Sequence, residues 1–277
     1  MEAVYRLLDA LLPLEAYRFS FMKNAFLAIL LLTPLLGLLG TMAVNHQMAF
    51  FSDALGHSAL TGIGLGILLG LHDDLLAMLV FGVIWAILIC VIKQSGSAST
   101  DTVISVFSST SVAAGLLILA RGGKFAKYSS LLIGDILAVT PQDLLYLLLA
   151  LVGTLILWAF LYNRLLLVSV DRFLARSRGV RTRLVECAFV VMVAIAVMLS
   201  IRWVGVMLIN ALLILPAAAG RNLARSARQH ACWSVGLALF CGLVGLTLSY
   251  YLDTSAGASI VLVSALCYAV SLALRRK

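Results

Sequence analysis

The chain has 277 residues, of which 63% are hydrophobic and only 12% are charged, and its formal net charge at pH 7 is +8. Because so few polar residues cannot cover a globule of this length, the composition excludes a soluble protein and indicates an integral membrane protein. The positive charge is explained by arginines that anchor cytoplasmic loops, so we expect no nucleic acid among the partners.

The first 23 residues mix charged and apolar side chains, and we expect an amphipathic lead-in there rather than a cleavable signal peptide. Uncharged runs of about 20 residues then recur, the length that an α-helix needs to cross the hydrocarbon core. These runs predict an all-α, polytopic helical bundle with about eight or nine transmembrane helices. The candidate spans are 25–44, 48–71, 75–92, 103–120, 144–161, 184–201, 203–220, 231–252 and 256–274. Residues 129–139, SSLLIGDILAV, are too short to cross, and we expect a re-entrant or interfacial helix.

Arginines set the expected orientation of these spans. They crowd the connection at 164–183 and, to a lesser extent, the connection at 221–228. Because cytoplasmic loops carry an excess of Lys and Arg, both connections should be cytoplasmic and the amino terminus should face outward. No internal repeat or linker divides the sequence, so we expect a single transmembrane domain over residues 1–277, with kinks at Pro34 and Pro216.

The stretch AFFSDALGHSALTGIGLG, residues 49–66, places Asp53 and His57 four residues apart within an apolar segment. This spacing puts both side chains on one helical face, about 6 Å apart, where they could bind one ion. Ionisable groups inside a membrane usually mark an ion or substrate path, although the two residues could also fix packing by hydrogen bonds to neighbouring helices. A carboxylate with an imidazole suits Zn²⁺ or Mn²⁺ better than an alkali ion.

Other polar residues carry weaker signals. Asp73 and Asp74 follow the same span and could gather cations at its outer mouth, although an ordinary solvated loop explains them as well. His46 and His230 lie near the expected cytoplasmic face with no partner at a telling spacing. The cysteines form no C-x-x-C pair, so we treat them as small buried residues; they are Cys90, Cys187, Cys232, Cys241 and Cys267.

The sequence contains no G-x-x-x-x-G-K-[ST] loop, so this chain cannot itself hold the phosphates of ATP. It also lacks the G-x-S-x-G and H-E-x-x-H motifs of hydrolases. We therefore expect a transport subunit that is not an enzyme and has no permanently bound cofactor. Any ATP that drives transport must act on another subunit.

Three segments together resemble the permease subunits of metal-type ABC importers, which take up zinc, manganese or iron. The first is MAFFSDALGHSALTGIGLG, similar to the family's helix with an aspartate and a histidine four apart. The second is WVGVMLINALLILPAAAGRNLARS, similar to a late helix of the family. The third is GDILAVTPQDL, residues 134–144, which with YYLDTSAGASIVLVSAL looks closest to zinc-uptake permeases. The resemblance covers nearly the whole chain and favours zinc over manganese.

The resemblance implies a cytoplasmic coupling helix that docks on an ATPase. The matching stretch here is VDRFLARSRGVRTR, in which Ala175 and Gly179 fit the pattern and Asp171 takes the place of its acidic residue. It also implies a homodimer of this chain in the bacterial cytoplasmic membrane, two copies of an ATPase, and an extracytoplasmic metal-binding protein. Asp53 and His57 would then form the transient transport site.

Two other classes of protein remain open at this point. A secondary cation transporter, driven by protons or sodium, could use Asp53 and His57 to exchange protons for metal and would need no coupling helix. A membrane scaffold would leave an intramembrane aspartate and histidine unexplained. A P-loop ATPase encoded beside this chain would favour the importer.

Overall fold

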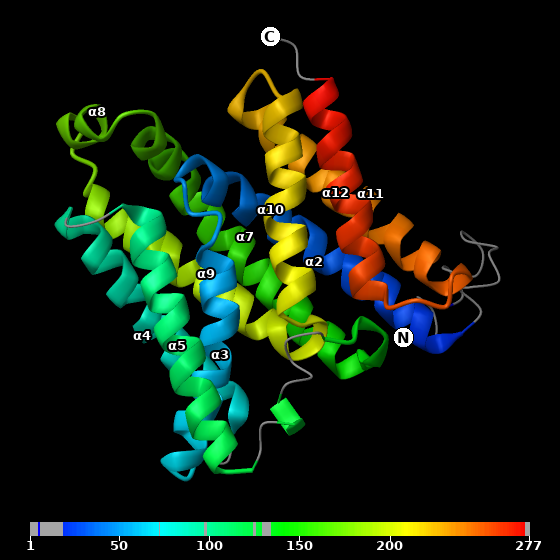
Figure 1. The fold of residues 1–277 in the computed structure, drawn as a ribbon. Coiled ribbons are helices and arrows are strands. Elements are labelled where there is room, and N and C mark those ends of the chain that lie inside the picture. The colour runs from blue at the N-terminus through cyan, green and yellow to red at the C-terminus, as the bar shows by residue number, and fades with distance from the viewer. Residues whose placement is uncertain are drawn as a thin grey trace. The chain divides into compact units, whose positions relative to one another are not determined.

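The fold was analysed in a computed structural model, which describes residues 5, 19–71, 73–96, 99–123, 126–128 and 134–274. These residues form long α-helices joined by short connections (Figure 1). The long helices are α2 (Ser20–Asn45), α3 (Phe51–Leu68), α4 (Asp74–Ser95), α5 (Thr100–Arg121), α7 (Pro141–Val170), α9 (Thr182–Val204), α10 (Val206–Leu223), α11 (Ala227–Tyr251) and α12 (Ala256–Ala273). Two short elements accompany them, the 3₁₀ helix η2 (Ile136–Ala138) and the helix α8 (Arg172–Ser177).

Each of the nine candidate spans coincides with one long helix, which confirms the all-α membrane fold. Within the described residues, eight helices are long and apolar enough to cross a membrane, and α3 is the long helix that is not among them. The aspartate, histidine and glycines of α3 keep its hydropathy below that of the eight candidate spans. The helix that carries the predicted metal pair is therefore the one whose composition departs from that of a simple membrane span.

Several helix ends differ from the expected ones. Helix α7 begins before and ends after the expected span 144–161, so 164–170 belong to a helix and not to the cytoplasmic connection. Helix α2 begins at Ser20, inside the expected lead-in; most of the lead-in lies outside the described residues. In the expected re-entrant segment, 129–133 also lie outside them, and the described part holds only the three-residue η2. The helices α2 and α10 continue through Pro34 and Pro216.

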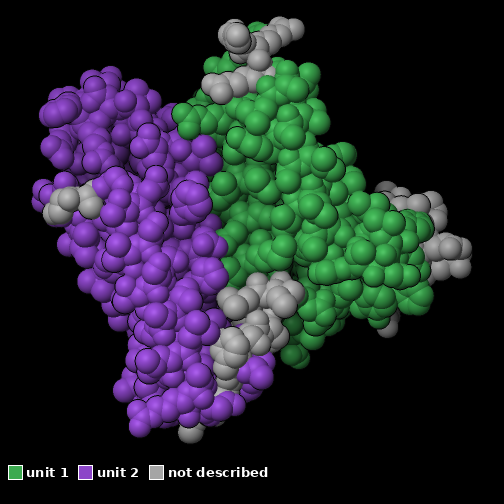
Figure 2. All heavy atoms as spheres, in the orientation of Figure 1, with its two compact units in different colours: residues 1–41, 133–152, 203–277 green, residues 42–132, 153–202 purple. Residues whose placement is uncertain are grey.

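The contacts divide the chain into two compact units, coloured separately in Figure 2. Unit 1 comprises residues 1–41, 133–152 and 203–277, and unit 2 comprises 42–132 and 153–202. Each unit holds part of α2, of α7 and of α9, because the division falls inside these three helices. The expectation of a single domain stays a prediction.

Unit 1 is built on the mutual packing of α10, α11 and α12. Small residues allow this close approach: a Cβ at Gly245 of α11 would lie 2.5 Å from Cα of Ile260 in α12. The segment that favoured zinc belongs to the same unit, where the side-chain amide of Asn24 donates to the carbonyl oxygen of Val139 over 3.1 Å. Gly134, with a φ of +72°, packs against the backbone of Val204 and Gly205. These contacts give this segment a structural role.

Unit 2 places α3 against both α4 and α5 (Figure 1). A Cβ at Gly66 would lie 2.5 Å from Cβ of Ala77 in α4, and one at Gly115 of α5 would lie 2.9 Å from the backbone nitrogen of Thr61. The Thr61 hydroxyl also hydrogen-bonds to the carbonyl oxygen of Ser111 in α5. Small residues therefore hold α3 tightly between its neighbours, as is common between membrane helices.

Candidate metal centre and coupling helix

Helix α3 is mostly buried, and it is open near Asp53 and His57 and again at its end. Thirteen of its eighteen residues are buried, and Asp53 and His57 are not among them. Their side chains are 48% and 34% exposed in the single chain. Because residues four apart lie on the same face of a helix, the two side chains form an open strip near the start of α3.

The two side chains meet on this strip. His57 Nε2 lies 3.6 Å from Asp53 Oδ1, so the spacing in the sequence correctly places them together. Asp53 lies in the first turn of α3, because the helix begins at Phe51 and not at the expected residue 48. The unpaired N–H groups of a first turn favour a carboxylate there, which lowers the cost of placing Asp53 in an apolar segment.

The described residues of one copy of the chain do not form a complete metal site. Among the residues that the structure describes, no group of three or more His, Cys, Asp or Glu side chains is placed to hold a metal ion. Zn²⁺ usually takes four ligands, and Asp53 with His57 supplies two. A metal bound to this pair would need further ligands from elsewhere.

The two outer carboxylates make structural contacts. Asp73 is the N-cap of α4, and its Oδ1 accepts from the backbone N–H of Leu75 and Leu76 over 2.9 and 3.4 Å. Asp74 Oδ2 accepts a hydrogen bond of 3.0 Å from Tyr128 Oη, which in turn accepts one of 3.1 Å from Lys127. His72, before them, lies outside the described residues. A lysine so close offsets the negative charge with which Asp74 could gather cations.

The short helix α8 has a defined beginning and end. Asp171 is its N-cap, and Oδ1 accepts from the backbone N–H of Phe173 and Leu174 over 2.7 and 3.2 Å. At the other end Gly179 has a φ of +76°, and the N–H groups of Gly179 and Val180 donate to the carbonyl oxygens of Arg176 and Ala175. This is a Schellman motif, in which glycine takes the left-handed position.

Each of the residues assigned to the coupling helix therefore has a clear place in it. Asp171 starts α8, Gly179 follows its last turn, and Ala175 between them is fully buried. The expected rigid short helix is present, within the connection between α7 and α9. Its coupling role stays a prediction.

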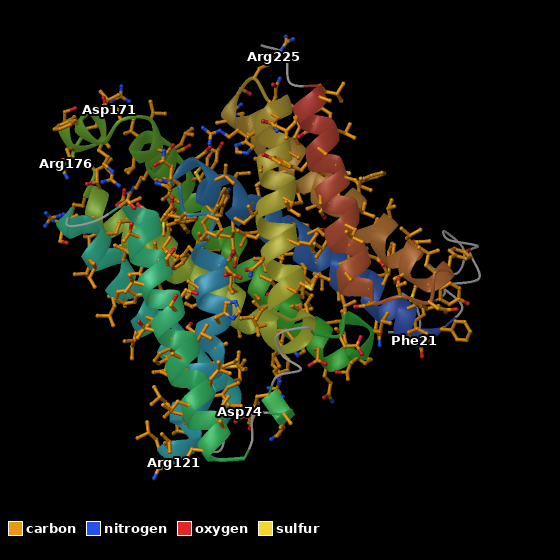
Figure 3. All side chains as sticks on the ribbon, viewed as in Figure 1. Phe21, Asp74, Arg121, Asp171, Arg176 and Arg225 are labelled. Atoms are coloured by element: carbon orange, nitrogen blue, oxygen red, sulfur yellow. The ribbon has the colours of Figure 1, made fainter. Side chains whose placement is uncertain are left out.

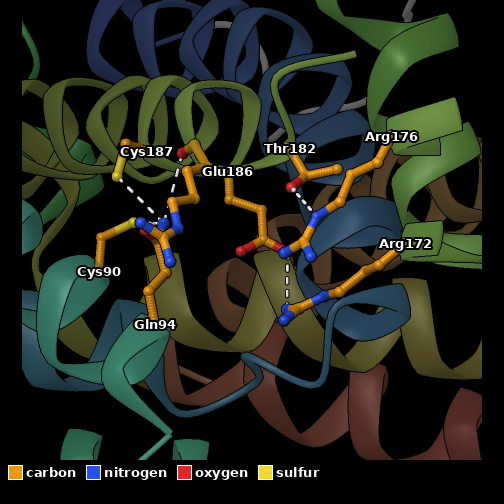
Figure 4. Close-up of polar contacts among 8 residues, drawn as sticks. Cys90, Gln94, Arg172, Arg176, Thr182, Glu186 and Cys187 are labelled. Atoms are coloured by element: carbon orange, nitrogen blue, oxygen red, sulfur yellow. Dashed lines mark hydrogen bonds and ion pairs between the residues drawn. The ribbon is translucent and has the colours of Figure 1, made fainter. Parts of the chain in front are cut away.

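Sequence reasoning missed the contact that attaches α8 to the helix after it. Arg172 Nη2 lies 2.7 Å from Glu186 Oε1 in α9, and the Glu186 side chain is only 8% exposed (Figure 4). A signal was available: Glu186 is an isolated acidic residue in an apolar span that directly follows an arginine-rich connection. A buried carboxylate in such a place requires a partner.

The described part of the chain has eight apolar helices long enough to span a membrane, a polar pair on another long helix and a short capped helix in a charged connection. These features define a polytopic membrane protein. Residues 18–275 match the ABC 3 transport family, and the chain belongs to that family. The match covers nearly the whole chain, including α3 and α8. It confirms the resemblance to ABC importer permeases drawn from the sequence motifs.

Two differently named relatives match this chain over most of their length. The high-affinity zinc uptake system membrane protein ZnuB of Haemophilus influenzae is 30% identical over 261 residues, covering 94% of this chain and 99% of that protein. The manganese import system permease protein ScaB of Streptococcus parasanguinis is 30% identical over 254 residues, covering 92% and 90%. The solved structure of PsaBC from Streptococcus pneumoniae in complex with Fab aligns with a TM-score of 0.80 at 28% identity, covering 98% of this chain and 95% of that chain.

Proposed function

We propose that this chain forms the translocation path of an ATP-driven importer of divalent metal ions. Two copies of the chain would assemble in a bacterial cytoplasmic membrane with two copies of an ATPase that docks on α8. An extracytoplasmic metal-binding protein would deliver the ion to the outer face. The names of the relatives, a zinc uptake membrane protein and a manganese import permease, support this class of substrate.

The observation that carries the proposal is the Asp53–His57 pair on the open strip of α3. Carboxylate and imidazole are ordinary ligands of Zn²⁺ and Mn²⁺, and ionisable residues inside membrane proteins are costly unless they serve an ion path or a buried pair. Most of the rest of α3 is packed against its neighbours. Further ligands could therefore reach an ion bound to this pair across the exposed face that Asp53 and His57 form.

The missing ligands are best supplied by the second copy of the chain. In a two-fold symmetric dimer the same surface meets itself, and a strip placed at the symmetry axis would bring one Asp53–His57 pair to face another. Two carboxylates and two imidazoles would complete a four-coordinate site without a further residue. The exposure of both side chains in the single chain supports this arrangement.

We place zinc first and manganese second. The preference follows the segments resembling zinc-uptake permeases, while the two relatives are equally similar to this chain, at 30% identity each. The mixed oxygen and nitrogen ligands suit both ions. Competition between the two metals in one transport assay would rank them directly.

The test uses the complex of this chain with the ATPase that co-purifies with it, reconstituted in lipid vesicles. Uptake of radioactive zinc or manganese is measured with ATP on the cytoplasmic side for wild type, Asp53→Ala, His57→Ala and Asp53→Asn. Because a methyl group cannot replace a ligand, we expect each alanine variant to lose about a hundredfold or more of the uptake rate. Asp101→Asn, an exposed carboxylate in the first turn of α5, is the matched control.

Assembly with the ATPase is measured in parallel and should be unchanged in all variants. Alanine variants that transport either metal at the wild-type rate would show that the pair is structural. Uptake that continues without ATP and stops when an ionophore collapses the proton or sodium gradient would instead identify a secondary transporter.

A further inference from the structure

A group of charged and polar side chains lies at the α8 end of unit 2, apart from the metal pair. We call His46, Lys93, Arg172 and Glu186 the α8 cluster. They come from the connection before α3, the last turn of α4, the start of α8 and the first turns of α9. All four lie in unit 2, and Glu186 is the one acidic residue of the four.

The first link of the cluster fastens α8 to α9. The exposed Arg172 side chain reaches the buried Glu186 carboxylate over 2.7 Å (Figure 4). One turn further along α8, Arg176 Nε donates to Thr182 Oγ1 at the start of α9 over 3.4 Å. Because burying a carboxylate is costly unless it is paired, the ion pair should resist separation of the two helices more than an exposed pair would.

A second link joins α9 to α4 in the same region. The Gln94 amide of α4 donates to the carbonyl oxygen of Arg183 over 3.3 Å and lies 3.4 Å from the Cys187 sulfur (Figure 4). Lys93, beside it, interacts electrostatically with Glu186 and Arg172. The carboxylate of Glu186 thus balances positive charge from two directions.

A third link leads from α9 to the connection that begins α3. The ring of His46 packs against Phe189, one turn beyond Glu186 in α9, with ring centroids 5.8 Å apart. Burial and the positive charges of Lys93 and Arg172 lower the pKa of His46 to about 4, so its ring is neutral at physiological pH. His46 lies five residues before the start of α3 and seven before Asp53.

We propose that Glu186 is a positioning residue that joins movement of the coupling helix to movement of the metal-bearing helix. This inference rests on the proposed function of α8 and α3. The Arg172–Glu186 pair holds α8 and α9 together, and the Phe189–His46 contact carries a displacement of α9 to the connection before α3. Without the pair, α8 could follow the ATPase while α3 stayed in place.

The test measures the ratio of metal imported to ATP hydrolysed in the reconstituted complex, with zinc and with manganese separately. The variants are Glu186→Gln, Arg172→Gln and the double variant, and the matched controls are Asp101→Asn and Arg121→Gln, both exposed and outside α8. Thermal unfolding and ATPase binding are recorded for each protein. We expect the ratio to fall about fivefold or more in all three variants and to stay at the wild-type value in both controls.

The double variant separates coupling from mere stability. Arg172→Gln alone leaves the buried Glu186 carboxylate without its ion pair, whereas the double variant leaves neutral side chains at both positions. The unfolding temperature of the double variant should therefore recover from that of Arg172→Gln. If Glu186 only stabilises the fold, the transport ratio should recover with it, and this result would overturn the proposal. A fall of less than fivefold in the ratio of metal imported to ATP hydrolysed in the single variants would also overturn the proposal.

Arg172→Lys replaces Glu186→Gln if the latter does not assemble, because lysine keeps the positive charge but loses the planar fork of arginine. The same fivefold threshold decides the outcome. A wild-type complex that hydrolyses ATP without moving either metal would overturn the proposed function itself. Failure of the Glu186 inference alone would instead show transport by the wild type and unchanged coupling in the variants.

Discussion

The two ends of unit 2 have the same kinds of helix cap and turn glycine, and they differ in the contacts that their charged side chains make. At one end Asp171 caps α8 and Gly179 follows its last turn; at the other end Gly70, with a φ of +72°, follows α3, and Asp73 caps α4. Figure 3 shows Asp171 and Arg176 at one end of this unit and Asp74 and Arg121 at the other. Caps and turn glycines therefore build helices and do not by themselves identify a functional end.

The difference lies in the charged contacts. The carboxylate of Glu186 is buried and joins two helices through Arg172. At the opposite end Asp74 meets Tyr128 and Lys127 near the surface, where solvent screens the charges. The comparison indicates that α8 is held to the rest of unit 2 by a contact that can transmit force. Paired variants at the two ends test this view.

The largest expected effect is an all-or-none difference in labelling. In a variant without native cysteines, Arg178→Cys should react with a membrane-impermeant thiol reagent only from the cytoplasmic side, and Asp73→Cys only from outside. Both positions are exposed, so accessibility should reflect the side of the membrane alone. Labelling of position 178 from outside would invert the orientation and remove α8 from contact with the ATPase.

The next effect concerns the two glycines with positive φ. Gly179→Val and Gly70→Val meet no atom within 4 Å of the new Cβ, so each should cost about 1–2 kcal/mol of backbone strain. Only Gly179→Val should weaken binding of the ATPase, by up to about tenfold, because fewer molecules hold α8 in its folded form. Titration of each variant with purified ATPase measures this, and equal affinities would contradict a docking role for α8.

A smaller effect is expected from the two caps. Asp171→Ala and Asp73→Ala each remove an N-cap, worth about 1 kcal/mol of helix stability. Binding of the ATPase should weaken by up to about fivefold for Asp171→Ala and stay constant for Asp73→Ala. Metal uptake by Asp73→Asn, which can still cap α4, should stay close to wild type; a large loss would show that the charge of Asp73 serves the outer mouth.

The smallest effect is on the pH dependence of stability. Burial and nearby cations lower the pKa of His46 to about 4, so the unfolded chain takes up a proton near pH 6.5 while the folded chain does not. Stability from this residue is thus complete above pH 6.5 and is lost as the pH falls toward 4.

His46→Gln should therefore lose less stability than the wild type between pH 7 and pH 4.5, which thermal unfolding would show. Lys127→Gln is the comparison at the other end, since the hydrogen bond with Tyr128 raises the pKa of Lys127 and keeps it charged throughout this range. An equal loss of stability in the wild type and in His46→Gln over this pH range would contradict a lowered pKa of His46.

The positions of the helices could be predicted from the sequence because the length of an apolar run is set by the membrane and is visible locally. The proximity of Asp53 and His57 was equally local, since it depends only on helical spacing. The end of α7 was missed because polar residues near Arg164 resemble the end of a span, although they do not interrupt backbone hydrogen bonding.

The ion pair of Arg172 with Glu186 could not be read from spacing, because it depends on how α8 folds back on α9. Similarly, nothing in the residues around His46 indicates that its ring lies against Phe189, far along the chain. Contacts between elements depend on tertiary packing, which one sequence does not reveal. The sequence therefore indicated the metal pair and missed the cluster that we propose connects it to α8.

The modest apolar character of α3 has a consequence for how the protein enters the membrane. Among the described residues, eight other helices are apolar enough to be recognised as spans, and α4, the next helix after α3, is the most apolar of these eight. A helix weakened by Asp53 and His57 would partition poorly alone, whereas a hairpin with α4 would carry it into the bilayer and bury its glycine face at once. Replacing both residues by leucine should then make the insertion of α3 depend less on α4.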